Sequence, residues 1–216
     1  MPAAMLNLSA LESDALVEIF NIGVGQAAAA MSEIVGEEVS MSVPSISFVN
    51  RAEAAGMLGL AGGGEERICG ISQHYEGAFE TEAILMFPED KSLEIVRLMV
   101  GESVPLQELS EMEQEAMSEI GNIILNACVG TLANIFQREL HGSLPEYHLG
   151  TSGEILARSG GQADAIVLML HIDFVLETHQ IHGYVAFILD LSALHDLRDL
   201  IDRYLALALG SAGGPG

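Results

Sequence analysis

The chain has 216 residues, of which 31 are Asp or Glu and 8 are Lys or Arg, so its formal net charge is −23 at pH 7. This charge repels phosphate backbones and anionic lipid headgroups, which argues against binding to nucleic acid or to a membrane surface. The longest uninterrupted apolar run, Ala54–Gly64, is shorter than the about 20 residues of a membrane-spanning helix, and no charged leader precedes an apolar segment at the amino terminus. We therefore expect a cytoplasmic, globular protein, and a monomer.

Apolar periodicity and turn signals predict the same series of elements twice along the chain. In the first half we expect a long helix opened by a capping box of Ser9 and Glu12, a strand near Val39–Phe48, a helix over Arg51–Leu60, strands near Arg67–Tyr75 and Phe79–Phe87, and a helix over Lys91–Val100. In the second half we expect a long helix opened by Ser110 and Glu113, a helix over Thr151–Arg158, strands near Ala165–Leu176 and Gln180–Leu189, and a helix over Ser192–Leu207. Strands joined by short turns favour antiparallel pairing, which indicates an α+β fold.

An offset of 101 residues relates the two halves, because it carries Ser9 onto Ser110 and Pro44 onto Pro145. The same offset lays Ala83–Met99 over Tyr184–Leu200 without a gap. The chain is therefore predicted to be a tandem pseudo-twofold duplication in which two long helices pack on an antiparallel β-sheet. We expect one domain over residues 1–207, made of repeats at about 9–100 and 110–207, and a Gly-rich disordered tail at 208–216.

The two long helices carry the same polar residues on the face opposite their apolar residues. At about 100° per residue, the first helix gathers its polar side chains within about 60° of arc: Asp14, Glu18 and Asn21. The second helix repeats the arrangement with Glu115, Glu119 and Asn122. The opposite, buried arc of the first helix includes Leu16, Ile19 and Ile34. Because the polar trio recurs in both copies, we interpret it as a functional site and not as an ordinary solvated helix face.

The residues of this trio fit a longer pattern, Asp/Ser-x₃-Glu-x₂-Asn-x₂₂-Pro, which resembles that of the CheC/CheX/FliY family of chemotaxis phosphatases. The first copy fits in full, with Asp14, Glu18, Asn21 and Pro44. The second copy fits at Glu119, Asn122 and Pro145, whereas Glu115 stands where the family favours Asp or Ser. The resemblance covers Leu11 to about Leu207 and is closest to the free-standing, two-site CheC branch. We expect neither the carboxy-terminal switch domain nor the amino-terminal docking peptide of the FliY branch.

The resemblance implies hydrolysis of the aspartyl phosphate on a CheY-type response regulator, in chemotaxis or related two-component signalling. It implies that Asn21 and Asn122 position water and that Glu18 and Glu119 pair with a lysine of the regulator. Asp14 and Glu115 are expected to make peripheral contacts with this substrate. Pro44 and Pro145 are expected to shape the chain. No cofactor of the chain's own is expected, and Mg²⁺ would come with the regulator.

Two other functions stay open. A non-catalytic module that binds the phosphorylated regulator or a CheD-type receptor deamidase would carry the same surface. The intact Glu-x-x-Asn in both copies favours catalysis, because an adaptor does not need the amide that positions water. A flagellar switch component is disfavoured.

His171-x-Asp173 and His179-x-x-His182 flank a hairpin connection predicted at Glu177-Thr178-His179 and could be read as a metal site. Strand alternation puts His171 and Asp173 on one face, but the spacing supplies no convincing third ligand. We interpret them as surface histidines near a turn and expect no metal site. Cys69 and Cys128 are predicted to be core thiols.

Overall fold

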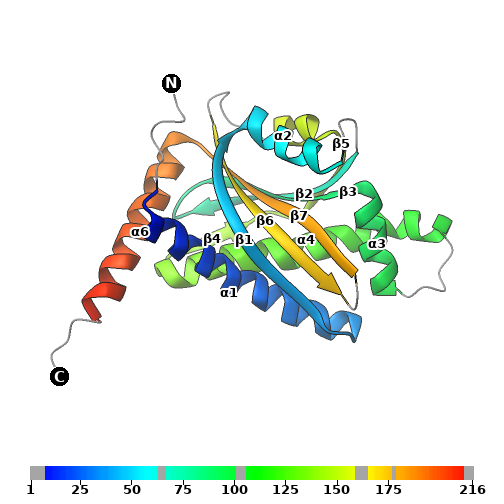
Figure 1. The fold of residues 1–216 in the computed structure, drawn as a ribbon, viewed down its shortest axis with the longest axis horizontal. Coiled ribbons are helices and arrows are strands. Elements are labelled where there is room, and N and C mark those ends of the chain that lie inside the picture. The colour runs from blue at the N-terminus through cyan, green and yellow to red at the C-terminus, as the bar shows by residue number, and fades with distance from the viewer. Residues whose placement is uncertain (1–7, 63–66, 101–105, 159–164, 177–178, 212–216) are drawn as a thin grey trace.

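The computed structural model describes residues 8–62, 67–100, 106–158, 165–176 and 179–211 (Figure 1). The first repeat forms α1 (Ala10–Val35), β1 (Val39–Asn50), α2 (Arg51–Gly62), β2 (Ile68–Gly77), β3 (Thr81–Pro88) and α3 (Glu89–Val100). The second forms α4 (Leu106–Phe136), β4 (Leu140–Gly142), β5 (Glu146–Gly150), α5 (Ser152–Arg158), β6 (Ile166–Leu176), β7 (His179–Leu189) and α6 (Leu191–Ser211). The last helix continues to Ser211, past its predicted end at 207, and residues 212–216 of the predicted tail lie outside the described residues.

Seven strands form one antiparallel sheet in the order β1-β6-β7-β3-β2-β4, and β5 also pairs with β2. The strand of the second repeat that corresponds to β1 is split into β4 and β5. Each repeat places this first strand beside the other repeat, because β1 pairs with β6 whereas β4 and β5 pair with β2. The order is therefore symmetric about the junction of β3 and β7. This interleaved sheet confirms the predicted α+β fold with a pseudo-twofold duplication.

The two long helices lie side by side against one face of the sheet and run in opposite directions (Figure 1). Their apolar sides fill the larger core together with the sheet, and the shorter α2 and α5 cover the other face over a second cluster. A Cβ on Gly23 of α1 would lie 3.0 Å from the Cα of Cys128 on α4. The missing side chain therefore allows the two backbones to approach closely.

By length and mean hydropathy alone, Ala10–Val35 and Glu111–Phe136 are each long and apolar enough to cross a membrane. Neither contains a long unbroken apolar run, because polar residues interrupt both. In the fold, the apolar sides of both helices pack against the sheet, where they form the core. Core packing accounts for their hydropathy.

Three details of the sequence prediction are wrong. The second long helix begins at Leu106, so its amino end lies before Ser110, and Glu113 accepts a 2.6 Å hydrogen bond from Ser92 instead of closing a capping box. Ile34 is 55% exposed, although Val35 in the same last turn of α1 packs against the core. The third detail is the ungapped match at an offset of 101, which lays Ala83 of β3 over Tyr184 of β7. These two residues lie on opposite faces of the sheet, because Ala83 belongs to the core under the long helices and Tyr184 packs against the cluster on the other face. An odd offset exchanges the two faces of a strand.

Candidate functional site

The amino end of α1 is fixed by the capping box that the sequence predicts. Ser9 N donates to Glu12 Oε2 at 2.6 Å, and Glu12 N donates to Ser9 Oγ at 3.3 Å. The hydrogen bond from the Ser9 hydroxyl, with help from the Ser9 backbone and the charge of Arg198, holds the pKa of Glu12 below its ordinary value. Arg198 on α6 lies 3.5 Å from this carboxylate. These contacts set the start of the helix that carries the first Glu-x-x-Asn pair.

Glu18 and Asn21 lie one turn apart on the same side of α1, as their spacing requires. Glu18 is exposed, whereas Asn21 is half-buried. No hydrogen bond or ion pair joins Glu18 to any part of the chain that the structure describes. Asp14, a further turn towards the amino end, is also exposed. The first site is thus a surface with free carboxylates next to a carboxamide that is partly covered.

The Asn21 carboxamide bonds to the backbone at an irregularity of β1. The register with β6 shifts between Ser42 and Ser45, so Val43 and Pro44 lie opposite one residue of the neighbouring strand. Val43 N donates to Asn21 Oδ1 at 2.8 Å, and Asn21 Nδ2 donates to the Val43 carbonyl at 3.3 Å. The same Nδ2 donates to the Val17 carbonyl at 3.0 Å. Asn21 therefore satisfies backbone groups that the bulge removes from the ladder.

These bonds define which atoms of Asn21 are left for another molecule. Both Nδ2 protons are used within the chain, and Oδ1 retains one of its two acceptor sites. One partner is a backbone N–H, which needs an acceptor, and two are carbonyls, which need a donor. These partners therefore fix which atom of the Asn21 amide is Oδ1 and which is Nδ2. Asn21 can accept one more hydrogen bond, such as one from a water molecule.

The second copy holds its carboxamide in a different way. Asn122 Oδ1 accepts from Asn126 Nδ2 at 2.7 Å and from Gln73 Nε2 at 3.2 Å. Gln73 also donates to the Ser143 carbonyl at 2.9 Å, and the Tyr75 hydroxyl lies within hydrogen-bond distance of both Gln73 Oε1 and Asn126 Oδ1. Burial raises the pKa of Tyr75 well above its ordinary value, so this hydroxyl stays protonated and can donate.

The free atoms of the two asparagines are therefore complementary. Asn122 Oδ1 is occupied twice, whereas its Nδ2 donates to nothing within the described residues. Glu119 is exposed, and it has no partner in the part of the chain that the structure describes. Glu115 is exposed as well. The second site offers a carboxylate and an amide donor, and the first offers a carboxylate and an amide acceptor.

The chain before the two prolines also differs between the copies. Val43 is 1% exposed and points into the core, whereas Leu144, the corresponding residue before Pro145, is 86% exposed. In the second copy the strand is interrupted between β4 and β5, and Ser143 bonds to the His74 backbone at the interruption. Leu144 thus stands out beside the network that holds Asn122. Pro44 is exposed and Pro145 half-buried.

Both asparagines lie on the polar faces of their helices, as the sequence predicts, but each is half-buried by its hydrogen-bond partners. Gln73 and Tyr75 were not predicted to belong to the site. The available signal was a glutamine on the core-facing side of an apolar strand, where it is only 2% exposed. Buried amides need partners. The predicted burial of the two cysteines is confirmed, and burial raises the pKa of Cys128 to about 12.

Comparison with known proteins places these features in context. Residues 11–48, which hold the first Glu-x-x-Asn, the bulge and Pro44, match the model of the CheC-like family. The resemblance to the CheC/CheX/FliY family is confirmed. CheY-P phosphatase CheC of Bacillus subtilis is 26% identical over 149 residues, which cover 68% of this chain and 70% of that protein. Flagellar motor switch phosphatase FliY of the same organism is 24% identical over 145 residues, covering 66% of this chain and 37% of that protein.

Solved structures share the CheC-like fold. The crystal structure of Thermotoga maritima FliY matches with a TM-score of 0.73 at 16% identity, covering 92% of this chain and all of that one. CheX in the CheX–CheY complex from Borrelia burgdorferi gives 0.52 at 16% identity, over 81% and 98% of the two chains. FliM in the FliG–FliM complex from H. pylori gives 0.60 at 11% identity, over 88% and 98%. The same fold thus occurs in a FliY protein and in the CheX–CheY and FliG–FliM complexes.

Proposed function

We propose that this chain hydrolyses the aspartyl phosphate of a CheY-type response regulator, with one reaction site on each long helix. The observation that carries the proposal is a pair of exposed carboxylates, Glu18 and Glu119, that have no partner among the described residues. Each lies one turn from a carboxamide fixed by the fold. The named CheY-P phosphatase relatives support this substrate. The CheX–CheY complex adds that a protein of this fold binds such a regulator.

An acyl phosphate is already reactive, so the work left to a catalyst is to place water in line with the phosphorus and keep it there. In the first site, Asn21 Oδ1 accepts a hydrogen bond from that water and leaves a lone pair of the water oxygen free to attack. The three hydrogen bonds to Val17 and Val43 hold the amide in place, so little order is lost when the complex forms. As the water oxygen bonds to phosphorus, the bond from phosphorus to the aspartyl oxygen breaks. Both protons of the water leave on the released phosphate, so no base on this chain is needed.

In the second site, Asn122 offers its Nδ2 protons, which suit a phosphoryl oxygen or the oxygen of the water. A donor to the water's oxygen occupies a lone pair and orients the nucleophile less well. To present its oxygen, Asn122 must give up bonds from Gln73 and Asn126. We therefore propose that both sites react and that the first contributes more of the turnover.

Docking is assigned to the two glutamates, because an exposed carboxylate can form a charge-assisted hydrogen bond with the regulator's lysine. Asp14 and Glu115 would add peripheral contacts from the preceding turn.

The Mg²⁺ that phosphoryl chemistry requires is proposed to sit on the regulator, since two acids and an amide on an open helix face form an incomplete shell for this ion. The two sites lie at opposite edges of the sheet, which would let each site bind its own regulator.

A binding module without catalysis is the second candidate, and Asn21 is the observation that favours it. Its carboxamide already has a structural role at the β1 bulge, so an Asn at this position is explained without a reaction. FliM, which shares the fold, was solved in a complex with FliG. A partner such as the phosphorylated regulator or a CheD-type deamidase would then be retained by the same exposed surface.

The test is release of phosphate from a phosphorylated receiver domain with and without this protein. Glu18→Gln should weaken capture of the regulator at the first site, and Glu33→Gln, an exposed glutamate farther along α1, is the matched control. Catalysis predicts turnover of more than one regulator per protein molecule. Retention of the phosphorylated regulator without faster phosphate release would support the binding module instead.

A further inference from the structure

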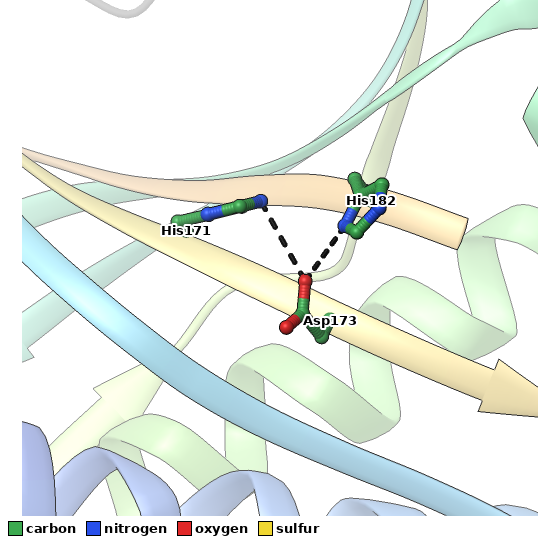
Figure 2. A group of neighbouring side chains, drawn as sticks. All are labelled: His171, Asp173 and His182. Atoms are coloured by element: carbon green, nitrogen blue, oxygen red, sulfur yellow. Dashed lines mark hydrogen bonds and ion pairs between the residues drawn. The ribbon is translucent and has the colours of Figure 1, made fainter. Parts of the chain in front are cut away.

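Two histidines and an aspartate meet on the sheet face opposite the long helices (Figure 2). His171 and Asp173 alternate along β6, and the register pairs Asp173 directly with His182 on β7. Asp173 Oδ1 lies 2.7 Å from His182 Nδ1 and 3.7 Å from His171 Nε2. One ligand atom from each residue lies within 4.8 Å of the others. His179 is not part of the group, because it lies three positions from His182 and so on the other face of β7.

We propose that His171, Asp173 and His182 form a binding site for a divalent transition-metal ion of the Zn²⁺ class. Imidazole nitrogens and a carboxylate oxygen are the ligands such ions prefer. Metal–ligand bonds of about 2.0–2.2 Å in a tetrahedral shell put neighbouring ligand atoms about 3.3–3.6 Å apart. The two separations from Asp173, at 2.7 and 3.7 Å, fall on either side of this range. Small side-chain rotations would bring all three ligand atoms to this spacing.

The position of His171 argues for a metal over a simple ion pair. The short contact between His182 and Asp173 is complete as a hydrogen bond without a third residue. At 3.7 Å, His171 Nε2 is beyond hydrogen-bond reach of the same oxygen, and it donates to no other atom in the described part of the chain. Its ring is nevertheless held towards the group by stacking on Tyr184, with centroids 5.2 Å apart and planes at 20°. An ion between the three side chains would use this orientation.

The surroundings suit a cation. The chain carries a net charge of −23, which favours metal capture, and the three side chains are accessible, with His182 54% exposed. Three protein ligands leave further coordination positions for water. Mg²⁺ is not the expected ion, because it prefers oxygen ligands in an octahedral shell. This site lies across the sheet from Asn21 and Asn122, so the proposal does not depend on the phosphatase activity.

The test is titration of the purified full chain with Zn²⁺ by calorimetry and with Co²⁺ by visible absorption. We expect one equivalent of each ion to bind. His171→Ala and Asp173→Asn should each lower the affinity at least about tenfold and abolish the Co²⁺ bands. His195→Ala is the matched control, since His195 is an exposed histidine near Asp199 on α6, and it should bind as the wild type does.

The three residues are partly exposed, so the variants should keep the wild-type unfolding temperature without metal. Added Zn²⁺ should raise that temperature in the wild type and in His195→Ala, but not in His171→Ala. Equal affinity in all four proteins, or several weak equivalents unaffected by His171→Ala, would mean that the acidic surface binds the ions generically. Either result would overturn the proposal.

Discussion

Asn21 and Val43 exchange hydrogen bonds in both directions, although they are 22 positions apart in the chain. The side chain of one therefore acts as the missing β-strand partner of the other. Pro44 follows at once and has no N–H to donate, which explains why the ladder is interrupted at this point. The spacing from Asn21 to Pro44 thus has a structural cause in the first copy. The same spacing in the second copy does not produce the same bonds, since Asn122 pairs with Gln73 instead.

Replacement of each asparagine by aspartate should change the free energy of unfolding by different amounts in the two sites. In Asn21→Asp a carboxylate oxygen would face the Val17 and Val43 carbonyls, which now accept from Nδ2. We expect a loss of about 1–3 kcal/mol in the free energy of unfolding. Asn122→Asp keeps an acceptor for Gln73 and Asn126 and should change stability by less than about 0.5 kcal/mol. Urea unfolding of both variants measures the difference, and equal losses would refute the described bonding.

Gly23→Ala tests the close contact between the long helices. The added Cβ would lie 3.0 Å from the Cα of Cys128 and 3.1 Å from the Ala127 carbonyl, both backbone atoms that cannot rotate away. We expect a loss of about 1–3 kcal/mol as the helices separate, although alanine favours helix formation. Gly25→Ala is the control, because a Cβ there has no atom within 4 Å. Thermal unfolding should rank Gly23→Ala below the wild type and Gly25→Ala at or above it.

Gln73 is predicted to be a positioning residue for the second site alone. Gln73→Leu removes the bond to Asn122 and the link to the Ser143 carbonyl. In an Asn122→Ala background, where the first site does the work, this change should leave kcat unaltered. In an Asn21→Ala background it should lower kcat with little change in KM, because the Asn122 amide loses its position while docking through Glu119 is retained. A loss of the same size in both backgrounds would indicate a general effect on the fold.

The capping box should make stability depend on acid pH. The folded-state pKa of Glu12 lies below its ordinary value of 4.5, chiefly because of the hydrogen bond from Ser9. Its contribution is therefore present above about pH 4.5 and disappears as the pH falls through the folded-state pKa. Glu12→Gln should be less stable than the wild type at neutral pH, and the gap should narrow on acidification. A gap that is constant between neutral and acid pH would exclude this role.

The repeat, the element order and the exposed glutamates could be predicted because they depend on local periodicity and on the offset of 101 residues that relates the two long helices. The interleaving of the strands could not, since it depends on which edge each first strand joins. The residues His171, Asp173 and His182 were considered as a metal site from the sequence but were interpreted as surface histidines, for a related reason. The hairpin connection was predicted one residue too long, at 177–179, whereas the register pairs Leu176 with His179. That one residue decides whether His182 lies opposite Asp173.

The central claim is tested most directly by the rate of phosphate release from a phosphorylated receiver domain with Asn21→Ala, Asn122→Ala and the double variant, each first shown to be folded. Each single variant should retain part of the activity, with the larger loss in Asn21→Ala because its free oxygen orients the water. The double variant should lose roughly 10²-fold or more, as when a positioned catalytic group is removed. Full activity in the double variant would contradict hydrolysis at these residues.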